Sequence, residues 1–222
     1  MIRLIDVVKK YAVNENESVI ALDNINLEIK KGQVVVLRGS SGSGKSTILS
    51  LIAALSKPTS GEVLVGGDRI SKLPDNFASE YRRHFIGFVF QKYNLIPTLS
   101  VEENIILPLV PMNLSEDEIK AKLQRVLKMF NIEHKSKQLV KNLSGGEQQR
   151  VAIARANINS PKIILADEPT ANLDEKLSLS FIEIIKELKE EGKTIIIATH
   201  DPLFFDLDIV DVEIEIYQGK II

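Results

Sequence analysis

The sequence contains no cysteine among its 222 residues. Disulfides, thiolate metal sites and cysteine nucleophiles are therefore excluded, and a reducing compartment fits this composition. Long hydrophobic runs are also missing: apolar runs such as Thr194–Ala198 are strand-sized, far short of the roughly 18 residues that a membrane helix needs. The N-terminus shows no basic segment followed by an apolar stretch, so no signal peptide is predicted. We expect a soluble protein whose membrane role would come through a partner.

The charge balance gives no sign of a polyanionic partner. Lysine and arginine number 28 against 30 aspartate and glutamate, a net charge of −2, so neither nucleic acid nor anionic lipid is predicted to bind. Hydrophobic residues make up 44% and charged residues 26%, as in ordinary globular proteins. The length fits one large domain or two small ones, without internal repeats.

Apolar segments of strand length alternate with helical patterns along most of the chain. Residues 2–9 and 19–29 alternate apolar and polar positions, as half-buried antiparallel strands do. The remaining expected strands cover residues 34–37, 61–66, 86–90, 163–166, 194–198 and 211–216, and the expected core helices cover 47–55 and 175–191. This order predicts an α/β fold: a mostly parallel sheet flanked by helices, with an N-terminal antiparallel β layer.

A mainly helical segment interrupts this pattern after about residue 92. Ser115 and Glu118 have the spacing of a capping box, and apolar residues follow on one helical face. We therefore expect a single domain over 1–222, with a core formed by 1–92 and 151–222 and a helical subdomain formed by 93–150.

A glycine-rich motif lies between an expected strand and an expected helix. It matches G-x-x-x-x-G-K-[ST], in which the backbone N–H groups and the helix N-terminus surround phosphate oxygens. We expect Lys45 to reach the β- and γ-phosphates and the Ser46 hydroxyl to bind Mg²⁺; a flexible Gly/Ser turn is the alternative. The predicted nucleotide-binding residues of this motif are Gly39, Ser40, Ser41, Gly42, Ser43, Gly44, Lys45, Ser46 and Thr47.

Two carboxylates end the apolar strand at 163–166. Ligands of such sheets bind beyond the carboxyl ends of the strands. Asp167 is therefore predicted to help hold Mg²⁺, and Glu168 to orient and deprotonate an attacking water. The pair alone is weak evidence, because strands often end in acidic residues, but the upstream phosphate loop strengthens it.

Three further side chains fall at expected strand ends. His200 follows 194–199 and can contact the γ-phosphate and help position the water and Glu168. Gln91 follows 86–90 and can touch Mg²⁺ or the water. The Tyr11 ring could stack on adenine, although a half-buried strand aromatic is an equal alternative.

A second possible anion site begins another expected helix, at residues 147–156. Ser144 and two glycines precede it, leaving backbone N–H groups open. An ordinary helix cap is the alternative. The residues are Ser144, Gly145, Gly146 and Glu147.

Together these motifs resemble the ATP-binding subunit of ABC transporters over essentially the whole chain. Residues 39–46 look like its Walker A loop, 163–168 its Walker B segment and 143–147 its signature motif, which is close to diagnostic after a Walker A loop. Gln91 matches the Q-loop, Tyr11 the adenine-stacking aromatic, 171–174 with Asp174 the D-loop, and His200 the switch histidine.

The segments 86–97, 100–104, 107–108 and 199–201 are similar to the class that serves FtsX-like permeases in lipoprotein release, macrolide or peptide efflux and cell division. Glu147 stands where many relatives have glutamine, and Asn157 where they have an aliphatic residue.

The resemblance implies an ATP hydrolase that uses Mg²⁺ and acts as an ATP-dependent homodimer, with each signature helix facing the other copy's γ-phosphate. It also implies a cytoplasmic location on the inner face of the membrane, where the groove beside Gln91 grips a permease. Alternatives are a soluble scaffold or mechanical ATPase without transport, or a DNA-repair or ribosome-acting ATPase. Three features argue against a DNA-repair or ribosome-acting ATPase: the lack of coiled-coil or zinc insertions, the single ATPase unit and the near-neutral charge.

Overall fold

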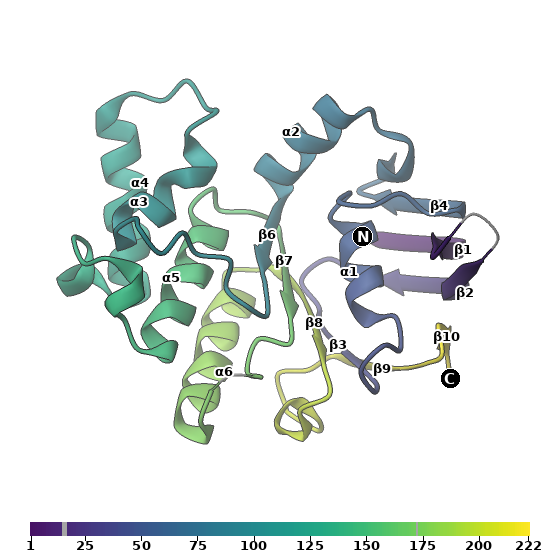
Figure 1. The fold of residues 1–222 in the computed structure, drawn as a ribbon. Helices are drawn as coiled ribbons and strands as arrows, with labels where there is room; N and C mark the ends of the chain where they lie inside the picture. The colour runs from purple at the N-terminus through teal and green to yellow at the C-terminus, as the bar shows by residue number, and fades with distance from the viewer. Residues whose placement is uncertain (15–16, 172) are drawn as a thin grey trace.

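The computed structural model describes residues 1–14, 17–171 and 173–222, which form two sheets with helices between and around them (Figure 1). The strands are β1 (Ile2–Ala12), β2 (Ser18–Ile29), β3 (Val34–Arg38), β4 (Ser60–Val65), β5 (Asp68–Arg69), β6 (Ile86–Val89), β7 (Ile163–Asp167), β8 (Thr194–Thr199), β9 (Val212–Tyr217) and β10 (Lys220–Ile221). The helices are α1 (Lys45–Ile52), α2 (Asp75–Phe85), α3 (Val101–Ile106), α4 (Glu116–Met129), α5 (Gly145–Asn157) and α6 (Glu175–Glu190). Short 3₁₀ turns are η1 (Ile70–Lys72), η2 (Leu107–Leu109), η3 (Glu133–Lys135), η4 (Val140–Asn142) and η5 (Pro202–Phe204).

The larger sheet has the strand order β10-β9-β3-β8-β7-β6. All neighbours from β9 to β6 pair in parallel, and only the short β10 is antiparallel. Parallel strands place all their carboxyl ends at one edge, so the segments that follow β3, β6, β7 and β8 meet there. The predicted mostly parallel sheet flanked by helices is confirmed.

The smaller sheet is antiparallel, with the order β2-β1-β4-β5. Its β1–β2 pair and the β1–β4 pair are both antiparallel, and the predicted N-terminal antiparallel layer is confirmed. One face is buried, with Ile2, Leu4 and Val7 of β1 almost fully removed from solvent. The other face carries exposed residues, which accounts for the alternating pattern of the sequence.

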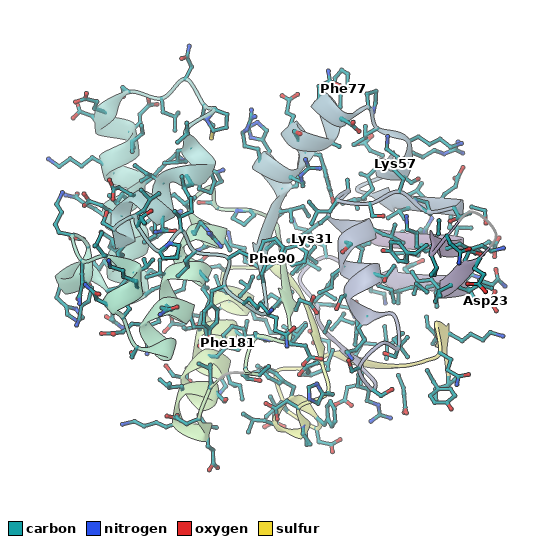
Figure 2. The ribbon with its side chains drawn as sticks, in the orientation of Figure 1. Asp23, Lys31, Lys57, Phe77, Phe90 and Phe181 are labelled. Atoms are coloured by element: carbon teal, nitrogen blue, oxygen red, sulfur yellow. The ribbon has the colours of Figure 1, made fainter. Side chains whose placement is uncertain are left out.

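Two hydrophobic cores cover the two faces of the parallel sheet. Val35 and Leu37 of β3 belong to the core that includes α1 and the antiparallel sheet, whereas Val34 and Val36 belong to the core that includes α3 to α6. In this second core Phe181 of α6, labelled in Figure 2, packs edge-to-face on Phe204. The ring centroids are 6.0 Å apart. Strands buried on both faces explain why their sequences are continuously apolar.

A helical lobe formed by α3, α4 and α5 lies on the side of the core away from the antiparallel sheet (Figure 1). Ser100, Ser115 and Ser144 each begin one of these helices with a capping box, and the one between Ser115 and Glu118 was predicted. The predicted domain boundary at residue 150 falls within α5, and the division into two subdomains stays a prediction.

Several predicted boundaries were wrong. Helix α1 begins at Lys45 and ends at Ile52, because Ala54 adopts a φ of 50° and the chain turns away before residue 55. Helix α5 begins at Gly145 rather than at residue 147. Helix α2 was not predicted, since only Ala78 and Tyr81 of its 11 residues are buried and most of its side chains are polar. None of the described helices is long and apolar enough to cross a membrane.

Candidate active site

The glycine-rich loop turns from the end of β3 into α1 and lines a cavity of about 220 Å³. Gly44 is the N-cap residue of α1 and has a φ of 111°. No side chain accepts a hydrogen bond from the first backbone N–H groups of α1. Gly39 lies so close to β9 that an added Cβ would be 2.2 Å from the Ile216 carbonyl oxygen. Around this cavity are residues Ser41 to Thr47 together with Ala21, Gln91, Glu168 and His200.

Lys45 is the first residue of α1, directly after the loop, and is only 4% exposed. Its Nζ donates to the carbonyl oxygens of Gly39, at 2.7 Å, and Ser40, at 3.1 Å. The same ammonium is 3.5 Å from Glu168 Oε1. A buried cation beside an uncapped helix N-terminus is suited to bind a polyphosphate.

Ser46 and Asp167 meet across the site from α1 and β7. The Ser46 hydroxyl donates to Asp167 Oδ1 at 2.8 Å. Burial raises the pKa of Asp167, and the hydrogen bond from Ser46 opposes that shift. The donor set fits Mg²⁺, which prefers hard oxygen ligands, takes one or two from protein and obtains others from phosphates and water.

Glu168 has an unusual backbone conformation for its position after β7. Its φ is 44°, and its N–H donates to the Ala198 carbonyl oxygen at 2.8 Å. A non-glycine residue with positive φ is uncommon and costs conformational energy, which the neighbouring strand contact offsets. The turn points the carboxylate toward the end of β8, where it is 12% exposed.

The end of β8 supplies three groups that hold this carboxylate. Glu168 Oε1 lies 3.0 Å from His200 Nδ1, and Oε2 accepts from the Thr199 hydroxyl at 3.1 Å and the His200 N–H at 3.3 Å. The predicted neighbourhood of Glu168 and His200 is therefore observed. Their catalytic roles stay predictions.

Thr199, Asp201 and Thr170 form a supporting network that sequence reasoning did not assign. The Thr199 hydroxyl accepts from the Asp201 N–H at 3.0 Å, and the Thr170 hydroxyl donates to Asp201 Oδ2 at 2.7 Å. The buried Gln149 amide donates to the Pro169 carbonyl oxygen at 2.7 Å and fixes the same turn from α5. The Thr-His-Asp arrangement at 199–201 was the only signal, and it did not show which groups would bond.

The other predicted nucleotide-binding residues are distributed around the loop. Gln91 lines the cavity just after β6. Gly39 and Ser40 line a neighbouring hollow with His200. Tyr11, near the end of β1, lies outside both hollows, is 43% exposed and has the Lys9 ammonium 4.8 Å from its ring centre. An exposed ring at this place is open to stacking, so its predicted role is not contradicted.

The signature residues lie apart from this cavity. Ser144 caps α5 through a capping box: its backbone N–H and its hydroxyl each donate to Glu147 Oε2 at 2.9 Å. Hydrogen bonding from the Ser144 N–H is the main cause that lowers the pKa of Glu147, which also pairs with Lys135 at 3.2 Å. The alternative of an ordinary cap is therefore realised structurally, while Ser144 remains on the surface.

Helix α6 lies against the start of the signature helix α5 at Gly146. Gly146 approaches Leu177 of α6 so closely that an added Cβ would be 2.5 Å from its side chain. Asp174 caps α6 by accepting from the Leu177 N–H at 2.9 Å. The predicted D-loop includes Asn172, which lies outside the described residues.

The fold and this site define a nucleotide triphosphatase of the phosphate-loop class. The family model described as "ABC transporter" matches residues 22–171. An ABC transporter ATP-binding protein of Methanocaldococcus jannaschii, MJ0796, is 47% identical over 210 residues, covering 90% of this chain and 87% of its own. The chain therefore belongs to the ABC transporter family and is one of its ATP-hydrolysing subunits.

Two further comparisons concern larger assemblies of related ATP-binding units. The macrolide export ATP-binding/permease protein MacB of Chlorobium luteolum is 42% identical over 204 residues, which cover 90% of this chain but 30% of MacB. The solved structure of dimeric MJ0796 in a post-hydrolysis state, bound to ADP and Pi, superposes with a TM-score of 0.91 at 42% identity. It covers 100% of this chain and 96% of that one.

Proposed function

We propose that this subunit hydrolyses ATP only as a head-to-tail pair of two copies and thereby drives a membrane permease. The observation that carries the proposal is the separation of the two helix N-termini, at Lys45 of α1 and Ser144 of α5. Helix α1 belongs to the hydrophobic core on one face of the parallel sheet, whereas Val151 of α5 belongs to the core on the other face (Figure 1). A single copy therefore offers Lys45 and Glu168 to one side of ATP but not its own Ser144.

The loop residues 41–47 and Lys45 would bind the phosphates of ATP, with Tyr11 available to the adenine. Ser46 and Asp167 would hold Mg²⁺, with Gln91 at the cavity wall beside them. When bound there, Mg²⁺ neutralises charge on the β- and γ-phosphates. The hydroxyl–carboxylate contact of 2.8 Å between Ser46 and Asp167 supports their joint assignment.

Glu168 would act as the base in hydrolysis. Water attacks the γ-phosphorus, the bond to the bridging oxygen of ADP breaks, and the water proton passes to the Glu168 carboxylate. His200 and Thr199 hold that carboxylate from the end of β8, which leaves it a fixed direction toward the loop. The His200 side chain is 61% exposed and so remains free to meet the γ-phosphate.

A second copy would complete the site through a twofold, isologous contact. Ser144 of the partner subunit and the N-terminus of its α5 would then face the γ-phosphate. Each hydrogen bond to a charged group contributes roughly 1.5–3 kcal/mol, so ATP would hold the pair closed. ADP lacks the contacted phosphate and has no such preference for the closed pair. The dimeric relative bound to ADP and Pi supports this arrangement.

Closing and opening would move a permease bound at the groove between the core and the helical lobe, beside Gln91. The relative MacB, in which an ATP-binding unit and a permease share one protein, supports such a partner. The subunit would then act in the cytoplasm on the inner face of the membrane, in efflux or in force transmission to the envelope.

The Glu168→Gln variant tests the dimer, because it should bind ATP without hydrolysing it. Light scattering of this variant should give a dimer with ATP and Mg²⁺ and a monomer with ADP. A monomer under both conditions would contradict the proposal. Copurification with an integral membrane permease tests the coupling separately.

A further inference from the structure

A cavity of about 680 Å³ lies between α2 and the β4–β5 turn, at the edge of the parallel sheet opposite the glycine-rich loop. Its lining includes Ile163 and Thr194, which are the first residues of β7 and β8. The nucleotide cavity lies at the other, carboxyl ends of these strands, so the two cavities are separate. Cavities of roughly 300–1,000 Å³ are typical of sites for small molecules, so this one has room for a ligand.

Apolar side chains form much of the wall of this cavity. Helix α2 contributes the three aromatic rings of Phe77, Tyr81 and Phe85. Tyr81 and Phe85 stack with ring centroids 5.8 Å apart, and the Tyr81 hydroxyl already donates to the Ile52 carbonyl oxygen at 2.9 Å. Phe77, labelled in Figure 2, is 54% exposed. An exposed phenylalanine near a stacked aromatic pair offers a surface on which a planar apolar molecule can pack.

Two lysines reach the cavity from the same edge of the parallel sheet. Lys31, also labelled in Figure 2, precedes β3, and Lys162 precedes β7, and these two strands flank β8 on either side. Lys162 Nζ lies 5.2 Å from the centre of the Phe85 ring. Neither ammonium group forms an ion pair with any residue that the structure describes. Two ammonium groups that no carboxylate neutralises, beside an apolar wall, suit a ligand with an anionic group on an apolar body.

The other charged side chains of the lining do not favour a cationic ligand. Arg69 of β5 is already paired with Glu62 at 3.1 Å. Asp68 of β5 and Glu80 of α2 make no ion pair within the described ranges, but they come from different elements. The two carboxylates therefore belong to separate walls, whereas the two lysines share one edge and can act on a single anionic group.

We propose that this cavity binds a small aryl carboxylate. The planar body packs against the aromatic rings of α2, and the carboxylate lies between the ammonium groups of Lys31 and Lys162. This second ligand site goes beyond the proposed function and does not depend on it, because it lies at the sheet edge opposite the ATP site.

The test uses three probes with one naphthyl body and different charges: naphthoate, naphthylmethanol and naphthylmethylammonium, each substituted at the same ring position. Ligand-observed NMR with the full chain should give naphthoate a dissociation constant between about 0.1 and about 1 mM. The neutral alcohol should bind about fivefold more weakly, and the ammonium probe no better than the alcohol. Saturating ADP and Mg²⁺ should not displace naphthoate, since the two cavities are separate.

Variants separate the apolar contact from the charged one. Phe77→Ala should weaken all three probes by a similar factor, because it removes apolar wall and no charge. Lys31→Gln and Lys162→Gln should each reduce the advantage of naphthoate over the alcohol to about twofold, and the double variant should abolish it. The matched control is Lys30→Gln, which makes the same charge change at the adjacent residue outside the lining and should preserve the advantage. Thermal melting should confirm that each variant is folded.

Four results would overturn the inference. They are no binding of any probe, equal binding of naphthoate and the alcohol, tighter binding of the ammonium probe, and displacement of naphthoate by ADP. A loss of the advantage in Lys30→Gln as large as in Lys31→Gln would also overturn it. None of these results bears on the proposed function, which is judged by the ATP-dependent dimer and by copurification with a permease.

Discussion

His200 Nδ1 lies 3.0 Å from Glu168 Oε1; the two residues directly follow the neighbouring strands β8 and β7 and are 32 positions apart in sequence. The contact requires Glu168 to adopt a φ of 44° at the end of β7. Backbone strain at such a place persists only where surrounding bonds determine it, here the contacts of Ala198, Thr199 and His200. The sheet edge therefore holds one carboxylate in a single direction beside the phosphate loop.

Glu168→Gln should lower the ATPase rate by roughly 10²–10⁴-fold, because the amide keeps the hydrogen-bonding shape but cannot take the water proton. ATP affinity should stay close to that of the wild type, since Lys45 and the loop are unchanged. Steady-state phosphate release and nucleotide titration measure the two quantities. An unchanged rate would remove Glu168 from the mechanism.

Thr199→Val should lower kcat by about tenfold or more, because the buried hydroxyl that positions the Glu168 carboxylate is lost and small misplacements are costly. Thr199→Ser keeps the hydroxyl and should restore most of the rate. The dissociation constant for ATP should be the same in both variants. Equal activity of the valine and serine variants would show that the hydroxyl has no positioning role.

Gly39→Ala should weaken both folding and ATP binding. The new Cβ would be 2.2 Å from the Ile216 carbonyl oxygen and 2.8 Å from Ser43 Oγ, at a φ of 151°. We expect a loss of roughly 2–4 kcal/mol in the free energy of unfolding, measured in urea.

Gly66→Ala is the matched control for Gly39→Ala. Its φ is 65° and nothing lies within 4 Å of the added Cβ, so only the cost of the left-handed conformation, about 1–2 kcal/mol, is expected. ATP binding should be unaffected. Equal losses of stability in the two variants would mean that the approach to β9 is unimportant.

Ser144→Arg should reduce hydrolysis roughly 10²-fold and prevent the ATP-dependent dimer, because a donor to the partner's γ-phosphate is lost and a bulky side chain takes its place. ATP binding by the monomer should remain. Ser115→Arg removes the same kind of capping box from α4, at a cost of about 1 kcal/mol, and should leave hydrolysis intact. If Ser144→Arg abolished ATP binding by the monomer, Ser144 would belong to its own chain's site.

The parts of the site that are contiguous in sequence could be predicted, and those that depend on side-chain geometry could not. The loop at 39–46 is one local segment and could be recognised by its motif. Asp167 and His200 follow apolar strands, and the expected parallel sheet places them at its carboxyl edge beside the loop. The bonds among Thr170, Thr199 and Asp201 depend on rotamers that no periodicity encodes.

The fold shows the same division. Strands β3, β7 and β8 are buried on both faces and were recognised by their continuous apolar sequences. Helix α2 is mostly exposed and polar, so its place is determined by contacts such as the hydrogen bond from the Tyr81 hydroxyl to the Ile52 carbonyl oxygen, 2.9 Å away. Such long-range contacts leave no signal in the local pattern.

The most direct test of the shared site mixes two inactive variants. Lys45→Ala lacks a working loop but keeps its signature helix, and Ser144→Arg has the opposite defect. If two copies enclose ATP between them, mixed dimers contain one intact composite site, and activity should recover to at most about a quarter of the wild-type rate. No recovery, in a mixture shown to contain mixed dimers, would contradict a site shared between two copies.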